Sequence, residues 1–452
     1  MIGNRWLTSA VCYLTVAVWT LAIFIGGGTR VGRIADMIVQ IVSLPLLLIA
    51  VYALLTAEAA RKIRVYVLIC VALLCLMALQ LVPIPPSLWQ LVPGRAVLPD
   101  LFAAADLSLP WLPLTLAPHA TLYAMAALIP SIAVFLGTLI LSLDRRYGLL
   151  IWPLAASTIS VFVGELQFSN ALDRAMFSFY QIDVVGYAAG LFANRNHYAA
   201  LNYAMMPLAA AWIILGRRSE TMSKTASMVV GGAVLAVLIV GITIAYSRAG
   251  VFLGVVAIVS CIWLFWTSRS EMNVPRWIAP LFIAGAVVIF IVFQLGFLAL
   301  IQERGVTDDQ RQMMWQKTVS LIEASPVTGY GFGTFVPVYM GAEKPTDITG
   351  YYINHAHNDW LEIILEGGIL AGIVLILFVG WVGVQSVRLW SRRAPRSDRI
   401  IMGRAGDVTV VLLLAHSLVE YPLRTTALAA TFAACCALMI QPSRRSGRSH
   451  ES

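Results

Sequence analysis

The chain has 452 residues, of which 60% are hydrophobic and only 12% are charged, and its mean hydropathy is +0.82. Soluble domains carry about 25% charged residues, so this composition excludes an ordinary soluble protein and indicates one that lies in a bilayer. Its apolar stretches reach the roughly 20 residues that a helix needs to cross about 30 Å of hydrocarbon. We therefore predict an all-α integral membrane protein and not a β-barrel, whose strands would be about ten residues of alternating character.

The net charge is +8, and the basic residues that produce it are unevenly distributed along the chain. In the termini and in alternate connections between apolar stretches lie 20 of the 31 basic residues. The positive-inside rule makes these connections cytoplasmic and places both termini inside. The surplus charge is then a topology signal, and we expect no nucleic-acid partner. The six cysteines all lie in apolar stretches, where we expect buried hydrophobic side chains and not disulfides or zinc ligands.

We predict a single polytopic membrane domain, residues 1–452, with about twelve transmembrane helices. The first apolar stretch lacks a cleavage signal, so it is counted as a retained span. The predicted spans are 7–26, 36–56, 65–82, 122–142, 149–168, 198–215, 227–246, 249–266, 277–300, 358–387, 406–421 and 425–441.

The external loops carry most of the unusual polar residues. The longest, residues 301–357, connects the ninth and tenth spans, and we expect it to carry part of an active site. Its residues 311–323 can form an amphipathic helix on the membrane surface. Ser325 and Pro326 would end that helix.

Arg248 lies in a tight turn between two apolar stretches, at the outer membrane boundary. An arginine at the bilayer centre costs about 2.5–3.5 kcal/mol, and somewhat less near the interface. Such a residue lines a cavity or pairs with another group, or else it snorkels to the interface. Arg311, in the long loop, is either a solvated charge or a second phosphate ligand. Two converging guanidinium groups would suit a lipid-linked diphosphate, because their planar forks match phosphate oxygens.

His355 and His357 stand just before the tenth predicted span. Their spacing resembles half of a metal site, but a third firm ligand is missing. The alternative is a general base near neutral pKa, which would take the proton of an acceptor hydroxyl. A purely structural role at the helix start also competes. Asp359 and Glu362 form a plausible capping box, which would leave His357 just outside the helix.

Three further groups of polar residues are candidates for supporting roles. The loop Gly329-Tyr330-Gly331-Phe332-Gly333 lacks the Lys-Ser/Thr ending of a nucleotide-binding loop, so we expect a tight turn packed against the membrane face. A second group heads the sixth span and either caps that helix or contacts a sugar or lipid phosphate. A third ends the eleventh span, where we expect interior-facing structural pairs. The supporting residues are Asn194, Arg195, Asn196, His197, His355, Asn358, Asp359, Gly368, Glu420 and Arg424.

Together these residues resemble the O-antigen ligase/polymerase superfamily of bacterial membrane glycosyltransferases. The resemblance covers roughly residues 83–424, with a ligase-like core at about 190–385. It rests on several motifs in order: 192–197, 246–250, Arg311 with Trp315, 329–335, and His357 followed by Gly368 after ten intervening residues. The family arginine is commonly followed by leucine at the fourth position, where this chain has Trp315. That departure weakens the match to lipopolysaccharide ligases and leaves room for an exopolysaccharide polymerase.

The resemblance implies a GT-C-like fold in the bacterial inner membrane, with an active site on the periplasmic face. It implies inverting, metal-independent transfer of a glycan from undecaprenyl diphosphate to an acceptor hydroxyl in surface polysaccharide biosynthesis. By the family pattern, His357 would be the catalytic base, and Arg248 and Arg311 would bind the diphosphate. The implied partners are the lipid-linked glycan donor, a glycan or lipid A-core acceptor and membrane lipid, and no cofactor is expected.

Two questions stay open at this point. Ligation to lipid A-core, polymerisation of a glycan, and transfer to a protein serine or threonine share the same donor chemistry, so the motifs do not choose among them. A twelve-helix transporter is a competing class. Transporters usually have repeated halves and ionisable residues near the midplane, whereas here most of the unusual polar residues lie on one face and the halves do not match.

Overall fold

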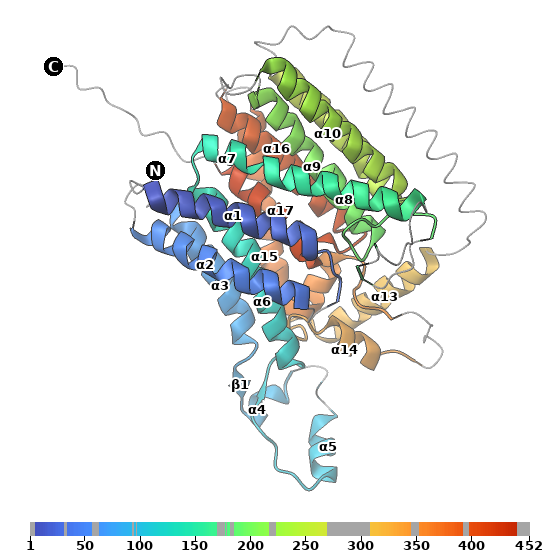
Figure 1. Ribbon diagram of the computed structural model, residues 1–452. Coiled ribbons are helices and arrows are strands. Elements are labelled where there is room, and N and C mark those ends of the chain that lie inside the picture. Colours follow the sequence, from blue (N-terminus) through green and yellow to red (C-terminus); the bar gives the residue numbers. More distant parts are fainter. Residues whose placement is uncertain are drawn as a thin grey trace, which may run out of the picture.

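The computed structural model describes residues 5–30, 34–56, 63–92, 95, 97–169, 177, 179–180, 185–216, 223–268, 308–344, 352–391 and 397–440. Its elements are α-helices, apart from one 3₁₀ turn and two short strands. The strands β1 (Pro83–Ile84) and β2 (Leu112–Pro113) pair antiparallel in a projection from one end of the bundle (Figure 1). The same projection carries α4 (Pro86–Trp89) and α5 (Leu98–Ala104).

The helix α9 (Arg195–Gly216) is the centre of the bundle. Every residue from His197 to Gly216 is buried. It packs against α10 (Lys224–Ile244), α11 (Arg248–Thr267) and α16 (Asp398–His416). Six alanines lie along α9, and such small side chains let neighbouring membrane helices approach closely. A helix enclosed in this way holds its first residues in a fixed position.

A second group of helices packs around α6 (Pro118–Ile140). It comprises α1 (Arg5–Ile25), α2 (Ile34–Thr56), α3 (Val65–Leu79) and α17 (Thr426–Met439). The indole of Trp19 in α1 donates a 3.0 Å hydrogen bond to the hydroxyl of Thr431 in α17. The short α7 (Leu143–Leu149) leads into α8 (Ile151–Ser169), which lies against α1 and α10. Because α17 also packs on α16, it joins the two groups.

The helix α15 (Asp359–Trp390) is interrupted at Gly368, whose φ of 61° and ψ of −154° are not helical. The interruption frees the carbonyls of Leu365 and Glu366, which accept hydrogen bonds from the amides of Tyr330 (3.1 Å) and Gly331 (2.9 Å). The two backbone segments of this contact approach so closely that neither Gly329 nor Gly368 has room for a side chain. A Cβ on either glycine would lie within 2.7 Å of the amide nitrogen of the other. The glycine-rich loop therefore satisfies the backbone of a broken membrane helix, which fits the tight turn expected from the sequence.

The long external loop contains α13 (Asp308–Ala324) and α14 (Phe335–Gly341). The first of these matches the helix expected over residues 311–323, and it ends immediately before Ser325 and Pro326. Both helices pack against α15, and α13 lies at the edge of the bundle (Figure 1).

An all-helical, multi-pass membrane protein is confirmed. Eight helices of the described chain are long and apolar enough to cross a membrane. The helices at two further predicted spans, α3 and α17, are shorter, with 15 and 14 residues. The predicted span 406–421 corresponds to α16, which begins at Asp398 and ends at His416. The predicted span 277–300 lies outside the described residues, so the count of twelve and the GT-C-like arrangement stay predictions.

Candidate active site around Glu420

Polar groups from five separate segments meet at one end of the bundle. The segments follow α1, precede α9, form the start of α13, precede α15 and follow α16. Most of these segments belong to the loops that the charge pattern predicts to be external. The η4 turn (Pro422–Arg424) completes the group and leads into α17.

Glu420 is the centre of this cluster, and its carboxylate is fully buried. Its Oε1 accepts hydrogen bonds from Nη2 of Arg311 and from Nδ2 of Asn196, each 2.5 Å long. Its Oε2 lies 3.0 Å from Nδ1 of His357. Burial alone would raise the pKa of Glu420, but His357 and Arg311 outweigh that effect and hold it below its ordinary value. The group is therefore a carboxylate that orients three neighbours.

His357 presents one ring nitrogen to Glu420 and is partly exposed, with 25% of its side-chain surface accessible. The ionised carboxylate only accepts hydrogen bonds, so in the neutral form of the ring the proton lies on Nδ1 and the lone pair on Nε2. The backbone of His357 has a φ of 50°, a conformation that costs a non-glycine residue energy. An oriented imidazole with a free Nε2 is the arrangement that a general base requires.

Arg311 lies in the first turns of α13 and reaches across to the segment after α16. Besides Glu420, it donates a 3.2 Å hydrogen bond from Nη1 to the carbonyl of Val419. Its side chain is 32% exposed. A guanidinium group has five N–H donors, so it has donors to offer a ligand in addition to these two bonds. The positive charge is thus held in place and still accessible.

Trp315, one turn further along α13, attaches this helix to the histidine segment. Its indole donates a 3.0 Å hydrogen bond to the carbonyl of Ala356. Ala356 stands between His355 and His357, so the bond fixes the backbone beside both imidazoles. A leucine at position 315, the residue common in the family, has no donor for this bond.

Arg248 is the first residue of α11 and is exposed. Ser247 caps that helix by accepting a 3.0 Å hydrogen bond from the amide of Gly250. A Cβ placed on Gly250 would lie 2.5 Å from that of Ala199, near the start of α9. Arg248 is therefore at the end of the bundle where α9 begins. Its convergence with Arg311 on one diphosphate stays a prediction.

The four residues that head α9 have different environments. Asn194 caps the helix through Oδ1, which accepts a 2.8 Å hydrogen bond from the amide of Asn196. Asn196 binds Glu420, whereas the guanidinium of Arg195 stacks 4.9 Å from the ring centre of Tyr187. His197 is fully buried, with Nε2 3.9 Å from Glu420 Oε2. Because His197 is fully buried, its side chain is not accessible to a sugar or a phosphate.

A second buried cluster surrounds His355. Its Nδ1 lies 2.8 Å from Oε1 of Glu362 and its Nε2 lies 3.0 Å from the carbonyl of Thr29. Arg424 pairs with Glu366 at 3.0 Å and with Glu362 at 3.5 Å. This pairing of Arg424 is the structural role expected from the sequence, whereas Glu420 belongs to the first cluster.

The predicted capping box at the start of α15 is wrong. Asn358 is the N-cap, and its Oδ1 accepts hydrogen bonds from the amides of Trp360 and Leu361. The Asp359 carboxylate turns inward to the hydroxyl of Ser417, at 2.8 Å, and to Arg424. Glu362 accepts from the amide of Ala356 and not from that of the N-cap residue. Both carboxylates therefore bind buried partners and neither caps the helix.

Tyr421 lies between the two clusters. Its ring centre is 4.3 Å from that of His355, 4.8 Å from that of His357 and 4.6 Å from that of His197. Three imidazoles thus contact one buried phenol. Nothing in the sequence assigned Tyr421 this role, and its only signal was its place directly after Glu420.

The two histidines of the His-x-His motif face different carboxylates, Glu420 and Glu362. Within the part of the chain that the structure describes, no group of three or more histidine, cysteine or acidic residues is placed to hold one metal ion. The arrangement favours the interpretation of His357 as a base over the half-site for a metal.

Comparison with known proteins finds similarity in part of the chain. Residues 232–376 match the family model described as O-Antigen ligase. This region includes Arg248, Arg311, His357 and Gly368, but neither Asn196 nor Glu420. A protein described as General O-oligosaccharyltransferase, from Acinetobacter baylyi, is 24% identical over 206 residues. The match covers 42% of this chain and 34% of that relative, so the chain spans about a third of the relative's length.

These matches confirm the resemblance that the motifs predict. Residues 232–376 thus carry the domain of that family, within a chain that has several helices long and apolar enough to span a membrane. The family points to an enzyme that transfers glycans.

Proposed function

We propose that the chain is a glycosyltransferase that moves a glycan from undecaprenyl diphosphate to an acceptor hydroxyl at the periplasmic face of the bacterial inner membrane. The observation that carries this proposal is the buried carboxylate of Glu420, which binds Arg311 through one oxygen and His357 through the other. A cation for a leaving diphosphate and a base for an attacking alcohol are thereby held side by side.

In the proposed reaction, the acceptor oxygen attacks the anomeric carbon while the bond from that carbon to the diphosphate oxygen breaks. The hydroxyl proton passes to Nε2 of His357, and Glu420 stabilises the resulting imidazolium. Negative charge grows on the departing diphosphate, where the guanidinium groups of Arg311 and Arg248 would stabilise it. Attack from the side opposite the leaving group inverts the linkage. Each of these roles is assigned without a metal ion.

A reconstituted assay tests the proposal. The full chain is placed in liposomes with an undecaprenyl-diphosphate-linked glycan, and transfer to added acceptor is measured. We expect loss of transfer in His357→Ala, Arg311→Ala and Arg248→Ala. Arg388→Ala is the matched control, because Arg388 is an exposed arginine in the last turn of α15, far along that helix from His357. Full transfer by His357→Ala would remove the proposed base.

Three acceptors are consistent with this chemistry: lipid A-core, a second glycan chain and a protein hydroxyl. The match to a general O-oligosaccharyltransferase gives the protein acceptor specific support. Trp315, in place of the more common leucine, keeps the polymerase under consideration. A deletion strain separates the outcomes: loss of long surface chains indicates polymerisation, accumulated lipid-linked polymer indicates ligation, and unmodified proteins indicate protein glycosylation.

A further inference from the structure

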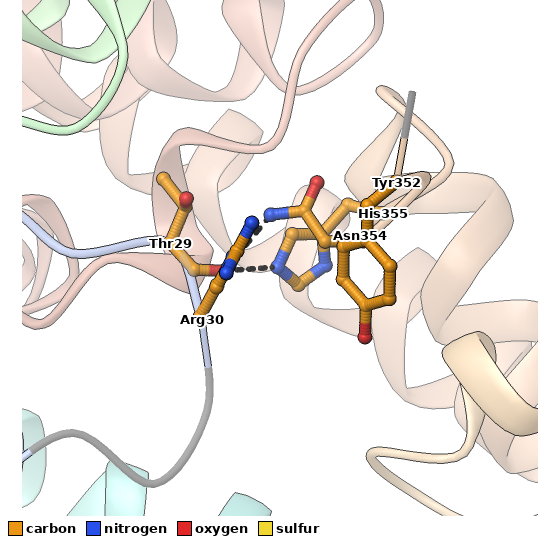
Figure 2. A pocket seen from close by; sticks show the side chains of 5 residues that line it. All are labelled: Thr29, Arg30, Tyr352, Asn354 and His355. Carbon is orange, nitrogen blue, oxygen red and sulfur yellow. Dashed lines mark hydrogen bonds between the residues drawn. The ribbon is translucent and has the colours of Figure 1, made fainter. Parts of the chain in front are cut away.

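A pocket of about 360 Å³ opens beside the candidate active site and is not used by the proposed mechanism. Figure 2 shows its lining, which comes from the segment after α1 and the segment before α15. The lining residues are Thr29, Arg30, Tyr352, Asn354 and His355. The carbonyl of Thr29 joins the two segments, since it accepts hydrogen bonds from Asn354 Nδ2 (3.1 Å) and from His355 (3.0 Å).

The pocket is cationic. Arg30 is exposed, and no carboxylate is found among the described lining residues. His355 faces an acceptor at each ring nitrogen, a carboxylate oxygen and a carbonyl, and this geometry favours the imidazolium form of the ring. Glu362 neutralises that imidazolium from the side away from the pocket. The charge offered to an occupant is therefore that of Arg30.

The pocket also has an aromatic surface. The Tyr352 side chain is 55% exposed, and the Arg30 guanidinium lies 5.2 Å from its ring centre. A guanidinium stacked on an aromatic ring keeps its N–H edge available for a planar anion. The side chains of Asn354 and Thr29 add groups that can bond to hydroxyls. Aromatic surface, hydroxyl partners and one forked cation together suit a sugar that carries a carboxylate.

The pocket is close to the proposed chemistry. His355 lines it, and His355 and His357 contact the same Tyr421 ring at 4.3 and 4.8 Å. A single aromatic ring thus separates the wall of the pocket from the candidate base. A short oligosaccharide can extend over such a separation, with one residue in the pocket and another at the reacting position.

We propose that this pocket is a subsite for an acidic sugar residue, whose carboxylate pairs with Arg30 while its ring rests against Tyr352. The proposal deepens the proposed function, because the occupant belongs to the glycan that is transferred or extended. It makes the enzyme selective for glycans that contain an acidic residue near the reacting end.

Direct binding tests this subsite without reference to transfer. The full chain in nanodiscs is titrated with a tetrasaccharide of alternating glucose and glucuronic acid, and separately with the same tetrasaccharide after carboxyl reduction. We expect the reduced form to bind at least about tenfold more weakly, the size of effect for one charge-assisted hydrogen bond. Arg30→Gln should remove that difference and Arg30→Lys should restore part of it. Tyr352→Ala should weaken both sugars, and Arg388→Gln should weaken neither.

Several results would overturn the proposal. These are equal binding of the two tetrasaccharides, an Arg30→Gln protein that still separates them, and displacement of the acidic tetrasaccharide by pyrophosphate at equal concentration. The last result would assign the pocket to a phosphate. Thermal unfolding of each variant verifies that it is folded, and Arg30 is exposed, so its replacement leaves the core intact.

A second experiment determines whether the acidic sugar belongs to the donor or to the acceptor glycan. The two tetrasaccharides are attached to undecaprenyl diphosphate and titrated again. Discrimination by the free sugars alone assigns the subsite to the acceptor, and discrimination by the lipid-linked sugars alone assigns it to the donor. If the lipid-linked sugars bind through Arg311 but neither arm discriminates, the subsite fails while the proposed function stands.

Discussion

Arg311 and His357 bind opposite oxygens of one buried carboxylate, although 109 and 63 residues respectively separate them from it along the chain. The cation and the base are consequently not independent. A change that moves Glu420 displaces both groups, whereas a change at either one leaves the other attached. Substitutions at Glu420 and at each of its two partners can therefore be told apart by their effects.

Glu420→Gln keeps the shape of the side chain but removes its charge. We expect transfer to fall by about 10²–10⁴-fold, the range attributed to general acid–base catalysis, because the amide no longer stabilises an imidazolium at His357. The measurement is kcat with saturating lipid-linked donor. Glu420→Asp retains the charge and should recover part of the rate. Unchanged kcat in Glu420→Gln would contradict the orienting role.

Arg311→Lys keeps a positive charge but loses the planar fork. Charge-assisted hydrogen bonds contribute about 1.5–3 kcal/mol, so we expect donor binding to weaken by roughly 10–100-fold. The affinity for undecaprenyl diphosphate, measured in nanodiscs, provides the readout. The replacement should leave binding of the free acidic tetrasaccharide unaltered. Equal donor affinity in both proteins would show that the fork is not used.

Trp315→Leu installs the residue that is more common in the family. It removes the indole donor to the Ala356 carbonyl, and the net cost of one such bond is about 0.5–1.5 kcal/mol. We expect kcat to decrease more than KM changes, because the imidazole segment loses its attachment while the diphosphate ligands are kept. Trp315→Phe retains the ring without the donor. If both variants keep wild-type kcat, the bond does not position His357.

The His355–Glu362 contact predicts a pH dependence of stability. Burial lowers the pKa of His355, but the charge and hydrogen bond of Glu362 outweigh it, so the folded-state pKa is raised. The stabilisation is complete below the unfolded value of about 6.5 and is lost as pH rises through the folded value. We expect the unfolding temperature of the wild type to decline relative to His355→Gln on the alkaline side of 6.5. A constant difference between the two proteins from pH 5 to 9 would exclude this linkage.

Gly368→Ala tests the broken helix. Gly368 has a φ of 61°, and its Cβ would lie 2.3 Å from the carbonyl oxygen of Val327. Backbone strain of this kind costs about 1–3 kcal/mol, and the collision adds to it. We expect a lower unfolding temperature and loss of transfer. Gly372→Ala, four residues further along α15, is the control, since a Cβ there meets nothing within 4 Å.

Most of the described helices could be predicted from the sequence because their apolar stretches are long enough to cross hydrocarbon. Arg248, Arg311 and His357 could be selected from their motifs. The central role of Glu420 could not, because a single carboxylate after an apolar helix has no periodic signal and its partners are distant in the sequence. Likewise, Asp359 and Glu362 fit the sequence pattern of a capping box, but in the structure both carboxylates pair with Arg424 and do not cap the helix.

The enclosure of α9 has a consequence for the enzyme in different membranes. Bilayers of unequal thickness are matched by tilting or sliding of helices that touch lipid. In the described structure the membrane span of α9 is completely buried by other parts of the protein and does not contact lipid. Asn196, at its first turn, therefore keeps its place against Glu420 while the outer helices adapt, so this contact is insulated from changes in lipid composition.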